Sequence, residues 1–444
     1  MTTPRRDGRV ALAEKLRGVG TCLPLDAKRK LAAQTGIERW YPYYAGYTEE
    51  FTRGVLRQLG EGETLTVLDP WNGSGTTTRI AHEMGHRPIG FDLNPVANLV
   101  ASAKIVHPDD AAHVTGLAKR LAEARPVEIA DDDPLMPWMA RSVISQYRAI
   151  EARILAELAT SKDGVALRPE HGNVPPLAAF MLLALIRAAR RTASMHRGTN
   201  PTWTTPGEGR RSTIRTLGRK WVERIVEMSA DLEATKNGGT PVPWTGRISI
   251  GDARKLPLGA SGVDLVVTSP PYCTRIDYVV SSSFELAALG VGSDSREFLE
   301  LRRASMGTPL ARKGAVPELP ERWPASVRGL LESIRTHQSK ASGSYYFKTF
   351  HQYFADAETS LKELHRVLRP GGLAVFVVQT SYYKELCVDL PSLYVDLGAT
   401  LGFRGEIAGQ AAVHRALAQI HPHSLHHRKE SQYREAVVAL EKVG

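Results

Sequence analysis

Two glycines after a short apolar stretch form the first pattern that can do chemistry. Thr64 to Leu68 alternate apolar and β-branched residues, which predicts a short buried strand. Gly73 and Gly75 follow, where a backbone without Cβ atoms turns tightly and approaches a ligand. A helix is predicted from Thr76 onward, with its free N–H groups pointing back at the turn. A strand, a glycine turn and a helix N-terminus are typical of a nucleotide-type site at a sheet edge.

A carboxylate after the next predicted strand strengthens this interpretation. Pro88 to Phe91 are apolar and end in Asp92, about 20 residues after the glycines, where a ribose-binding acid is expected. Helix capping is the plain structural alternative for Asp92. Asn94 and Pro95 already have the residue types that cap and open a helix, so Asp92 is left for a ligand.

A proline pair ends another apolar strand, which is predicted over Val263 to Thr268. This motif reads Ser269-Pro-Pro-Tyr272, and the glycine turn lies within Asp69-Pro-Trp-Asn-Gly-Ser-Gly-Thr-Thr77. The two motifs together resemble those of S-adenosylmethionine-dependent DNA methyltransferases that act on exocyclic amino groups, where the first usually reads Asp-Pro-Phe-x-Gly-Ser-Gly-Thr-Thr. Trp71 replaces the usual Phe and keeps an aromatic ring. The Ser form of the second motif is typical of cytosine-N4 enzymes, and the Asp form of most adenine-N6 enzymes.

The resemblance implies direct methyl transfer from S-adenosylmethionine to an amino nitrogen, which is a poor nucleophile because its lone pair is delocalised into the ring. Ser269 Oγ and the carbonyl of Pro270 are expected to accept the amino hydrogens, and the paired prolines hold that carbonyl rigidly. Tyr272 is expected to stack on the target base, which must be flipped out of the duplex. No metal and no covalent intermediate are needed. Cys273 follows the motif, whereas C5-cytosine enzymes carry their nucleophile in a Pro-Cys pair.

Site residues follow from the resemblance position by position. The expected catalytic residues are Ser269, Pro270, Pro271 and Tyr272. The expected cofactor-binding residues are Asp69, Pro70, Trp71, Asn72, Gly73, Ser74, Gly75, Thr76, Thr77, Asp92, Asn94, Asp252 and Ala253. Among them, Asp92 is expected to accept both ribose hydroxyls, and Asp252 to accept from the adenine amino group. Tyr41, Tyr43 or Tyr44 either packs on the methionine moiety or fills the space under the sheet edge.

The expected fold is α/β: a Rossmann-like class I methyltransferase with a mixed, mainly parallel sheet and helices on both faces. It carries a large, mainly helical insertion and a second, smaller one. The expected parts are an N-terminal arm (1–36), a catalytic domain in three pieces (37–104, 246–292 and 346–444), and insertions at 105–245 and 293–345. In the last piece, Leu373 to Val378 predict a buried fifth strand, and Arg434 to Leu440 an edge strand.

A basic stretch in the first insertion predicts DNA contact. Between Arg187 and Arg224 there are ten Lys or Arg residues against two Glu. A loop within it can hold phosphates and present an aromatic ring to a base. The expected DNA-binding residues are Arg197, Trp203, Arg210 and Arg211. A solvated basic helix face is the plain alternative, and the Arg-, Pro- and Ser-rich insertion at 293–345 is a rival for the same role.

Composition limits the class of protein. A net charge of +10 over 444 residues suits a polyanionic partner such as double-stranded DNA. Cys22, Cys273 and Cys387 are few and far apart, which argues for a reducing compartment and against a disulfide framework or a zinc site. No secretory signal and no apolar run of about 18–20 residues stands out, so no membrane partner and a cytoplasmic location are expected. Five histidines between His414 and His427 lack zinc-ligand spacing, so no metal is expected.

Three functions stay open from the sequence. The favoured one is a site-specific cytosine-N4 DNA methyltransferase of a restriction-modification or defence system. The alternatives are an adenine-N6 DNA methyltransferase and a cofactor-binding DNA-recognition subunit without catalysis. The intact Ser269–Tyr272 motif counts against the last. The target sequence, the oligomeric state and a separate cognate restriction endonuclease are left open.

Overall fold

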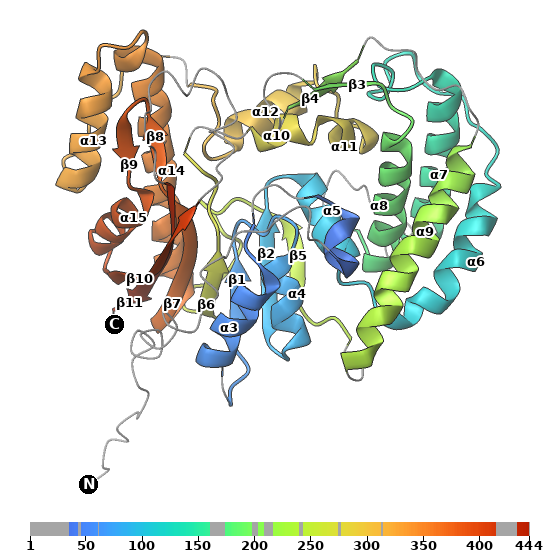
Figure 1. Ribbon diagram of the computed structural model, residues 1–444, viewed down its shortest axis with the longest axis horizontal. Helices are drawn as coiled ribbons and strands as arrows, with labels where there is room; N and C mark the ends of the chain where they lie inside the picture. Colours follow the sequence, from blue (N-terminus) through green and yellow to red (C-terminus); the bar gives the residue numbers. More distant parts are fainter. Residues whose placement is uncertain are drawn as a thin grey trace.

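A computed structural model describes residues 35–42, 46–60, 62–159, 174–197, 203–207, 216–238, 243–273, 277–311, 314–413 and 433–443. A seven-stranded sheet in the order β10-β11-β7-β6-β1-β2-β5 forms its centre (Figure 1). From β7 to β5 neighbouring strands run parallel, whereas β11 is antiparallel to both β7 and β10. The expected α/β, Rossmann-like fold with a mainly parallel sheet is therefore confirmed.

The strands of this sheet are β1 (Thr66–Asp69), β2 (Arg87–Asp92), β5 (Arg247–Ile250), β6 (Val263–Thr268), β7 (Leu368–Gln379), β10 (Phe403–Val413) and β11 (Tyr433–Lys442). The chain places β2 on one side of β1 and β6 on the other, so the strand order reverses at β1. In an open parallel sheet, this reversal opens a crevice at the carboxyl ends of the strands, where ligands bind.

Alternate residues of the central strands face opposite sides of the sheet, because side chains along a strand have a period of two. Val67 and Val267 pack under α3 (Glu49–Leu59) and α4 (Thr76–Glu83). Leu68 and Val266 face the other way, toward α14 (Phe347–Val367) and α15 (Leu390–Ala399). The sheet is thus covered by helices on both faces.

The first insertion contributes helices that stand to one side of the sheet, beyond α5 (Figure 1). They are α6 (Ala111–Ala122), α7 (Arg141–Leu158), α8 (Pro176–Arg190) and α9 (Leu217–Ala234), with a short ribbon of β3 (Met195–Arg197) and β4 (Thr204–Pro206). One apolar core joins them to α5 (Pro95–Ala103), with Phe180 and Trp221 fully buried in it. The first helical region therefore shares its core with the helix that follows the second strand of the sheet.

The remaining elements lie in the second insertion, just before it and in the connections between the other elements. The segment before the second insertion contains α10 (Tyr278–Ser281) and α11 (Ser283–Ala288). The insertion itself contains α12 (Arg296–Ala304) and α13 (Ala325–Thr336), and η6 (Ser342–Tyr346) lies at its end. Elsewhere lie η2 (Gly36–Trp40), η3 (Pro108–Asp110), η5 (Thr235–Gly238), β8 (Ser381–Tyr383) and β9 (Leu386–Val388). None of the helices in the described ranges is long and apolar enough to cross a membrane.

One strand prediction is wrong in its position. The segment Arg434–Leu440 was expected at the sheet edge, but β11 lies between β7 and β10, and β10 forms the edge. The run Ala436 to Leu440 is buried without interruption, as a strand covered on both faces requires. The uninterrupted apolar run, rather than an alternating one, is the sequence feature that indicates an interior strand.

Candidate functional site

A pocket opens at the carboxyl ends of β1, β2, β5 and β6. Several expected site residues line it together: Asp69, Pro70, Trp71, Asn72, Gly73, Ser74, Thr76, Asp92, Asn94, Asp252, Ala253, Ser269 and Pro271. Gly75, Thr77, Pro270 and Tyr272 are not among its lining residues. Two motifs almost 200 residues apart in sequence thus meet at one site, because β1 and β6 are neighbours in the sheet.

The glycine turn has the backbone conformation that its sequence predicts. Gly73 and Gly75 have φ values of 48° and 79°, in the left-handed region that favours glycine. Gly75 also caps α4 and allows a close approach to α5, since a Cβ there would lie 2.8 Å from the Ala101 Cβ. The turn therefore needs glycine both for its backbone angle and for the packing of the two helices behind it.

Asp92 joins the end of β2 to the glycine turn. Its carboxylate accepts hydrogen bonds from the backbone N–H groups of Gly73 and Asn94, both at 2.9 Å. The Asn94 side chain accepts from the N–H of Val96 and so caps α5, as predicted. Burial raises the pKa of Asp92 to about 6, and the two backbone hydrogen bonds oppose that rise. Each oxygen keeps acceptor capacity toward the pocket.

Asp69 connects β1 to β6 and to a tyrosine that the motifs did not indicate. Thr268 Oγ1 and Tyr47 Oη donate to its carboxylate at 2.6 and 3.0 Å. Burial raises the pKa of Asp69 to about 6, against these hydrogen bonds. Tyr47 lines the pocket and also contacts Thr77, whose hydroxyl is buried and donates to the carbonyl of Val267. Thr77 therefore supports the site from behind.

Ser269 lies at the end of β6 with its hydroxyl oriented by the neighbouring strand. Ser269 Oγ donates to the carbonyl of Val377 on β7 at 2.8 Å. A hydroxyl has one hydrogen and two lone pairs, so Ser269 can serve the pocket only as an acceptor. Tyr353 Oη donates to the carbonyl of Pro271 at 3.1 Å, which fixes the proline pair against α14.

Two tyrosines, one inside this motif and one just after it, have different places at the site. Burial raises the pKa of Tyr272 well above its usual value, nearby Glu435 and Tyr278 act in the same direction, and a hydrogen bond with Ser269 opposes them. Tyr278 on α10 lines the pocket, and burial raises its pKa, with the charge of Asp92 adding to the effect. The sequence singled out Tyr272 and missed Tyr278.

Asp252 is held by an arginine that follows it. Arg254 donates to its two carboxylate oxygens from Nε at 2.9 Å and Nη2 at 2.7 Å. Arg254 also reaches Asp356 on α14 at 2.9 Å and the carbonyl of Ala304 at 2.6 Å. Burial lowers the pKa of Arg254, but the two carboxylates outweigh burial and raise it. The arginine thus ties the turn after β5 to α14 and to the end of α12.

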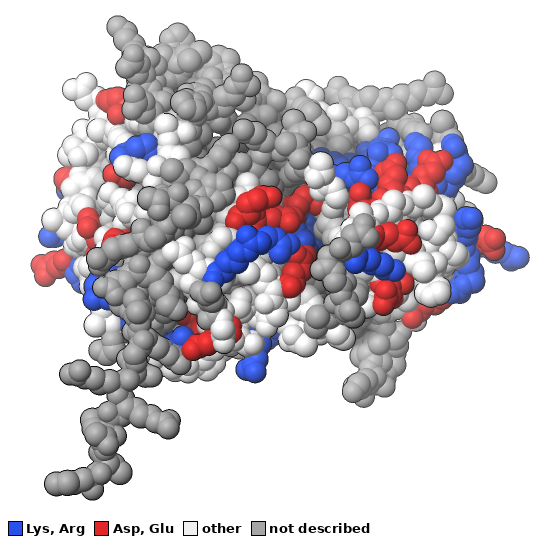
Figure 2. Space-filling model, turned by 60° about the horizontal axis from the view of Figure 1, so that its bottom comes forward, with Lys and Arg blue, Asp and Glu red and all other residues white. Residues whose placement is uncertain are grey.

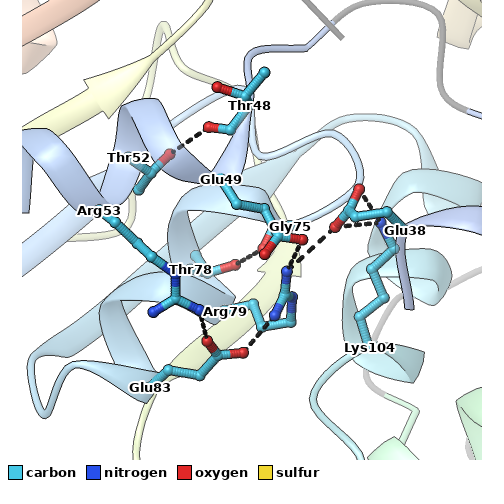
Figure 3. Close-up of polar contacts among 10 residues, drawn as sticks. All are labelled: Glu38, Thr48, Glu49, Thr52, Arg53, Gly75, Thr78, Arg79, Glu83 and Lys104. Atoms are coloured by element: carbon cyan, nitrogen blue, oxygen red, sulfur yellow. Dashed lines mark hydrogen bonds and ion pairs between the residues drawn. The ribbon is translucent and has the colours of Figure 1, made fainter. Parts of the chain in front are cut away.

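An ion-pair cluster centred on the buried Arg79 lies behind the glycine turn (Figure 3). Arg79 on α4 pairs with Glu38 at 3.3 Å and with Glu49 and Glu83, and its side chain is 7% exposed. Lys104, at the end of α5, also pairs with Glu38 at 3.3 Å. Because Glu38 belongs to η2 and Glu49 begins α3, the cluster fastens the segment before β1 to the helices that follow β1 and β2.

The expected DNA-binding residues are described only in part. Trp203 precedes β4 and is 39% exposed, and Arg197 is the last residue of β3. Arg210 and Arg211 lie outside the described residues, as do Tyr43 and Tyr44. Tyr41 is buried in the core shared with the first helical region, under the guanidinium of Arg187. On the face shown in Figure 2, the described basic and acidic side chains are interspersed and form no patch of one sign.

Comparison with known proteins identifies relatives at low identity. No family model matches the chain. The chain is 22% identical to the Type II methyltransferase M.BsoBI of Geobacillus stearothermophilus over 416 residues, covering 83% of this chain and 79% of that protein. It is 20% identical to the Type II methyltransferase M.AvaI of Nostoc sp. and of Anabaena variabilis over 392 residues, with the same shares covered.

Proposed function

We propose that this protein is an S-adenosylmethionine-dependent DNA methyltransferase that acts on the N4 amino group of cytosine in duplex DNA. The observation that carries the proposal is that Ser269, with its hydroxyl oriented as an acceptor, lines the same pocket as the glycine turn and Asp92. The similarity to type II methyltransferases over most of the chain supports DNA as the substrate and a restriction-modification role.

The pocket's residues fit the cofactor. The carboxylate of Asp92 uses one acceptor position per oxygen on backbone N–H groups, which leaves positions for two ribose hydroxyls. Asn72 lines the pocket, and among the described residues its buried Nδ2 has no hydrogen-bond partner, although its Oδ1 accepts from Thr78. The Asn72 amide packs against Gly90 of β2, where an added Cβ would lie 2.6 Å from Nδ2, so it holds the glycine turn against that strand. S-adenosylmethionine supplies a methyl group on a sulfonium.

The chain's own residues then prepare the nucleophile. Ser269 Oγ accepts one amino hydrogen of the flipped base, and the carbonyl of Pro270 accepts the other, so that the nitrogen becomes more tetrahedral and its lone pair is released. Val377 keeps the Ser269 hydrogen away from the base. Because both acceptors are fixed before the base arrives, they act by preorganisation rather than by removing a proton. The methyl group would pass to the amino nitrogen with S-adenosylhomocysteine as the leaving group, and the extra proton would leave the nitrogen afterwards. Tyr272 is proposed to stack on the base from outside the cofactor pocket.

A nucleoside analysis of the product tests the proposal. Purified protein is incubated with S-adenosylmethionine and duplex DNA of mixed sequence, and the digested DNA is examined by mass spectrometry. N4-methylcytosine is the expected product. N6-methyladenine would keep the methyltransferase and remove the cytosine assignment. If the protein binds both cofactor and duplex but methylates neither base, the enzyme proposal fails and a recognition subunit takes its place.

A further inference from the structure

One wall of the pocket is built by residues outside both sequence motifs. Ser360 on α14 lines the pocket with 0% of its surface exposed. Within the described part of the chain, its hydroxyl has no hydrogen-bond partner. Serine and threonine in helices often donate to the carbonyl four residues earlier, as the preceding Thr359 does to Ala355 at 2.8 Å. Ser360 makes no such bond within the described residues, so its hydroxyl still has a hydrogen to donate.

The surroundings of Ser360 are held rigidly by long-range contacts. Asp356, one helical turn earlier, binds Arg254, which also binds Asp252. The segment after Arg254 lies along α14, where Glu363 accepts from the N–H of Leu256 at 2.9 Å. Ser360 and Asp252 are therefore fixed on one wall of the pocket, without a hinge between them.

The order of the strands indicates which part of the ligand reaches this wall. Ser269 follows β6, the glycine turn follows β1, Asp92 ends β2 and Asp252 follows β5, and these strands are consecutive in the sheet. Three strand spacings separate β6 from β5, roughly 14 Å at the usual distance between strands. A cofactor that presents its methyl group at Ser269 and its ribose at Asp92 therefore extends its base toward Asp252.

We propose that Ser360 donates a hydrogen bond to a ring nitrogen of the cofactor's adenine and so helps to select the purine. The wall offers the hydroxyl of Ser360 for a ring nitrogen and the apolar side chains of Ala253 and Met306 for the faces of the ring. The carboxylate oxygens of Asp252 are taken up by Arg254, so Ser360 is the polar side-chain group considered for the ring. The assignment rests on the proposed function, because it takes S-adenosylmethionine as the ligand. It goes beyond that function by assigning a contact with the adenine of the cofactor to α14, a helix that lies outside both motifs.

A double-mutant cycle between protein and ligand tests the assignment. The affinity of S-adenosylhomocysteine is measured by calorimetry for the wild type and for Ser360→Ala, together with its 1-deaza, 3-deaza and 7-deaza analogues. Ser360→Ala is expected to weaken binding of the parent compound roughly tenfold, the size of one lost hydrogen bond. On the wild type, the analogue that lacks the contacted ring nitrogen is expected to bind more weakly than the parent compound by the same factor. On Ser360→Ala, that analogue and the parent compound are expected to bind equally. Thr359→Ala, which removes an exposed hydroxyl from the adjacent position, is the matched control and leaves every affinity unchanged.

Two results would overturn the assignment in different ways. If Ser360→Ala binds the parent compound as the wild type does, or if every analogue loses the same factor on both proteins, Ser360 makes no contact with a ring nitrogen, while the proposed function stands. If the wild type does not bind S-adenosylhomocysteine at all, the proposed function fails and the assignment fails with it. Thermal unfolding of both variants in the absence of ligand identifies any loss of affinity that arises from misfolding.

Discussion

The Ser269 hydroxyl donates its hydrogen to the carbonyl of Val377, 2.8 Å away on the neighbouring strand. The contact joins residues 108 positions apart and decides the polarity of Ser269 toward the pocket. A serine that had to remove a proton would need a basic partner, whereas a serine that only accepts needs its own hydrogen held elsewhere. The backbone of β7 does this without a titratable group.

Replacement of Ser269 should therefore affect turnover and spare binding. Ser269→Ala removes an acceptor whose hydrogen bond strengthens as the amino nitrogen becomes tetrahedral, so kcat should fall about 100-fold or more. DNA and cofactor affinity should stay near the wild-type values. Ser269→Asp restores an acceptor and should recover part of the rate. Single-turnover kinetics with separate binding measurements check this, and a parallel loss of cofactor affinity would contradict it.

Asp92 should make cofactor binding depend on pH near 6. Burial raises the pKa of its carboxyl to about 6, and hydroxyl donors favour the charged form. The affinity should therefore be highest above pH 6 and fall as the pH drops below it, by up to about tenfold per pH unit. Asp92→Asn should weaken binding by about 2–4 kcal/mol at pH 7.5 and lose this dependence.

A second carboxyl, that of Asp69, also has a raised pKa, so the Asp92→Asn variant is needed to assign the pH dependence. Burial also raises the pKa of Asp69 to about 6, but its oxygens accept from Tyr47 and Thr268 within the protein. Any pH dependence that survives in Asp92→Asn belongs to Asp69 or to another group. Calorimetry with S-adenosylhomocysteine between pH 5 and 8 separates the two, and an unchanged profile in Asp92→Asn would exclude Asp92 as its source.

The parts of the site that were predictable are those encoded locally. Gly73, Asp92 and Asn94 act within one turn of their own strand ends, so the types and order of neighbouring residues predict their conformations. The β6 and β7 strands were also recognisable, because their apolar runs are typical of buried parallel strands.

The parts that were missed depend on long-range contacts. Arg254 meets Asp356 across 102 positions and Tyr47 meets Asp69 across 22 positions, and neither pair has a sequence signature of its own. Ser360 lies in the middle of an amphipathic helix, where a buried serine indicates packing as readily as binding. The interior position of β11 also depended on a partner strand that the sequence analysis did not predict.

The cluster around Arg79 should dominate the stability of the region behind the glycine turn. Arg79→Met leaves Glu38, Glu49 and Glu83 without their shared cation and should lower the free energy of unfolding by about 3–5 kcal/mol. Arg53→Met is the matched control, because Arg53 pairs with Glu83 alone among these acids and its side chain is 31% exposed. Its cost should stay below about 1 kcal/mol. Urea unfolding of both variants checks the difference, and equal losses would contradict the central role of Arg79.

The salt dependence of duplex binding should show which of the two insertions contacts DNA. Replacing Arg210 and Arg211 by Ala should weaken duplex binding and reduce the slope of log K against log salt concentration by about one per lost phosphate contact. Trp203→Ala should instead leave the slope unchanged and reduce affinity by about 1–3 kcal/mol through lost stacking. Arg303→Ala, at an exposed position of α12 in the second insertion, is the comparison. Fluorescence anisotropy with one duplex at several salt concentrations measures all four proteins. If Arg303→Ala flattens the slope and the Arg210 and Arg211 replacements do not, the second insertion holds the DNA backbone.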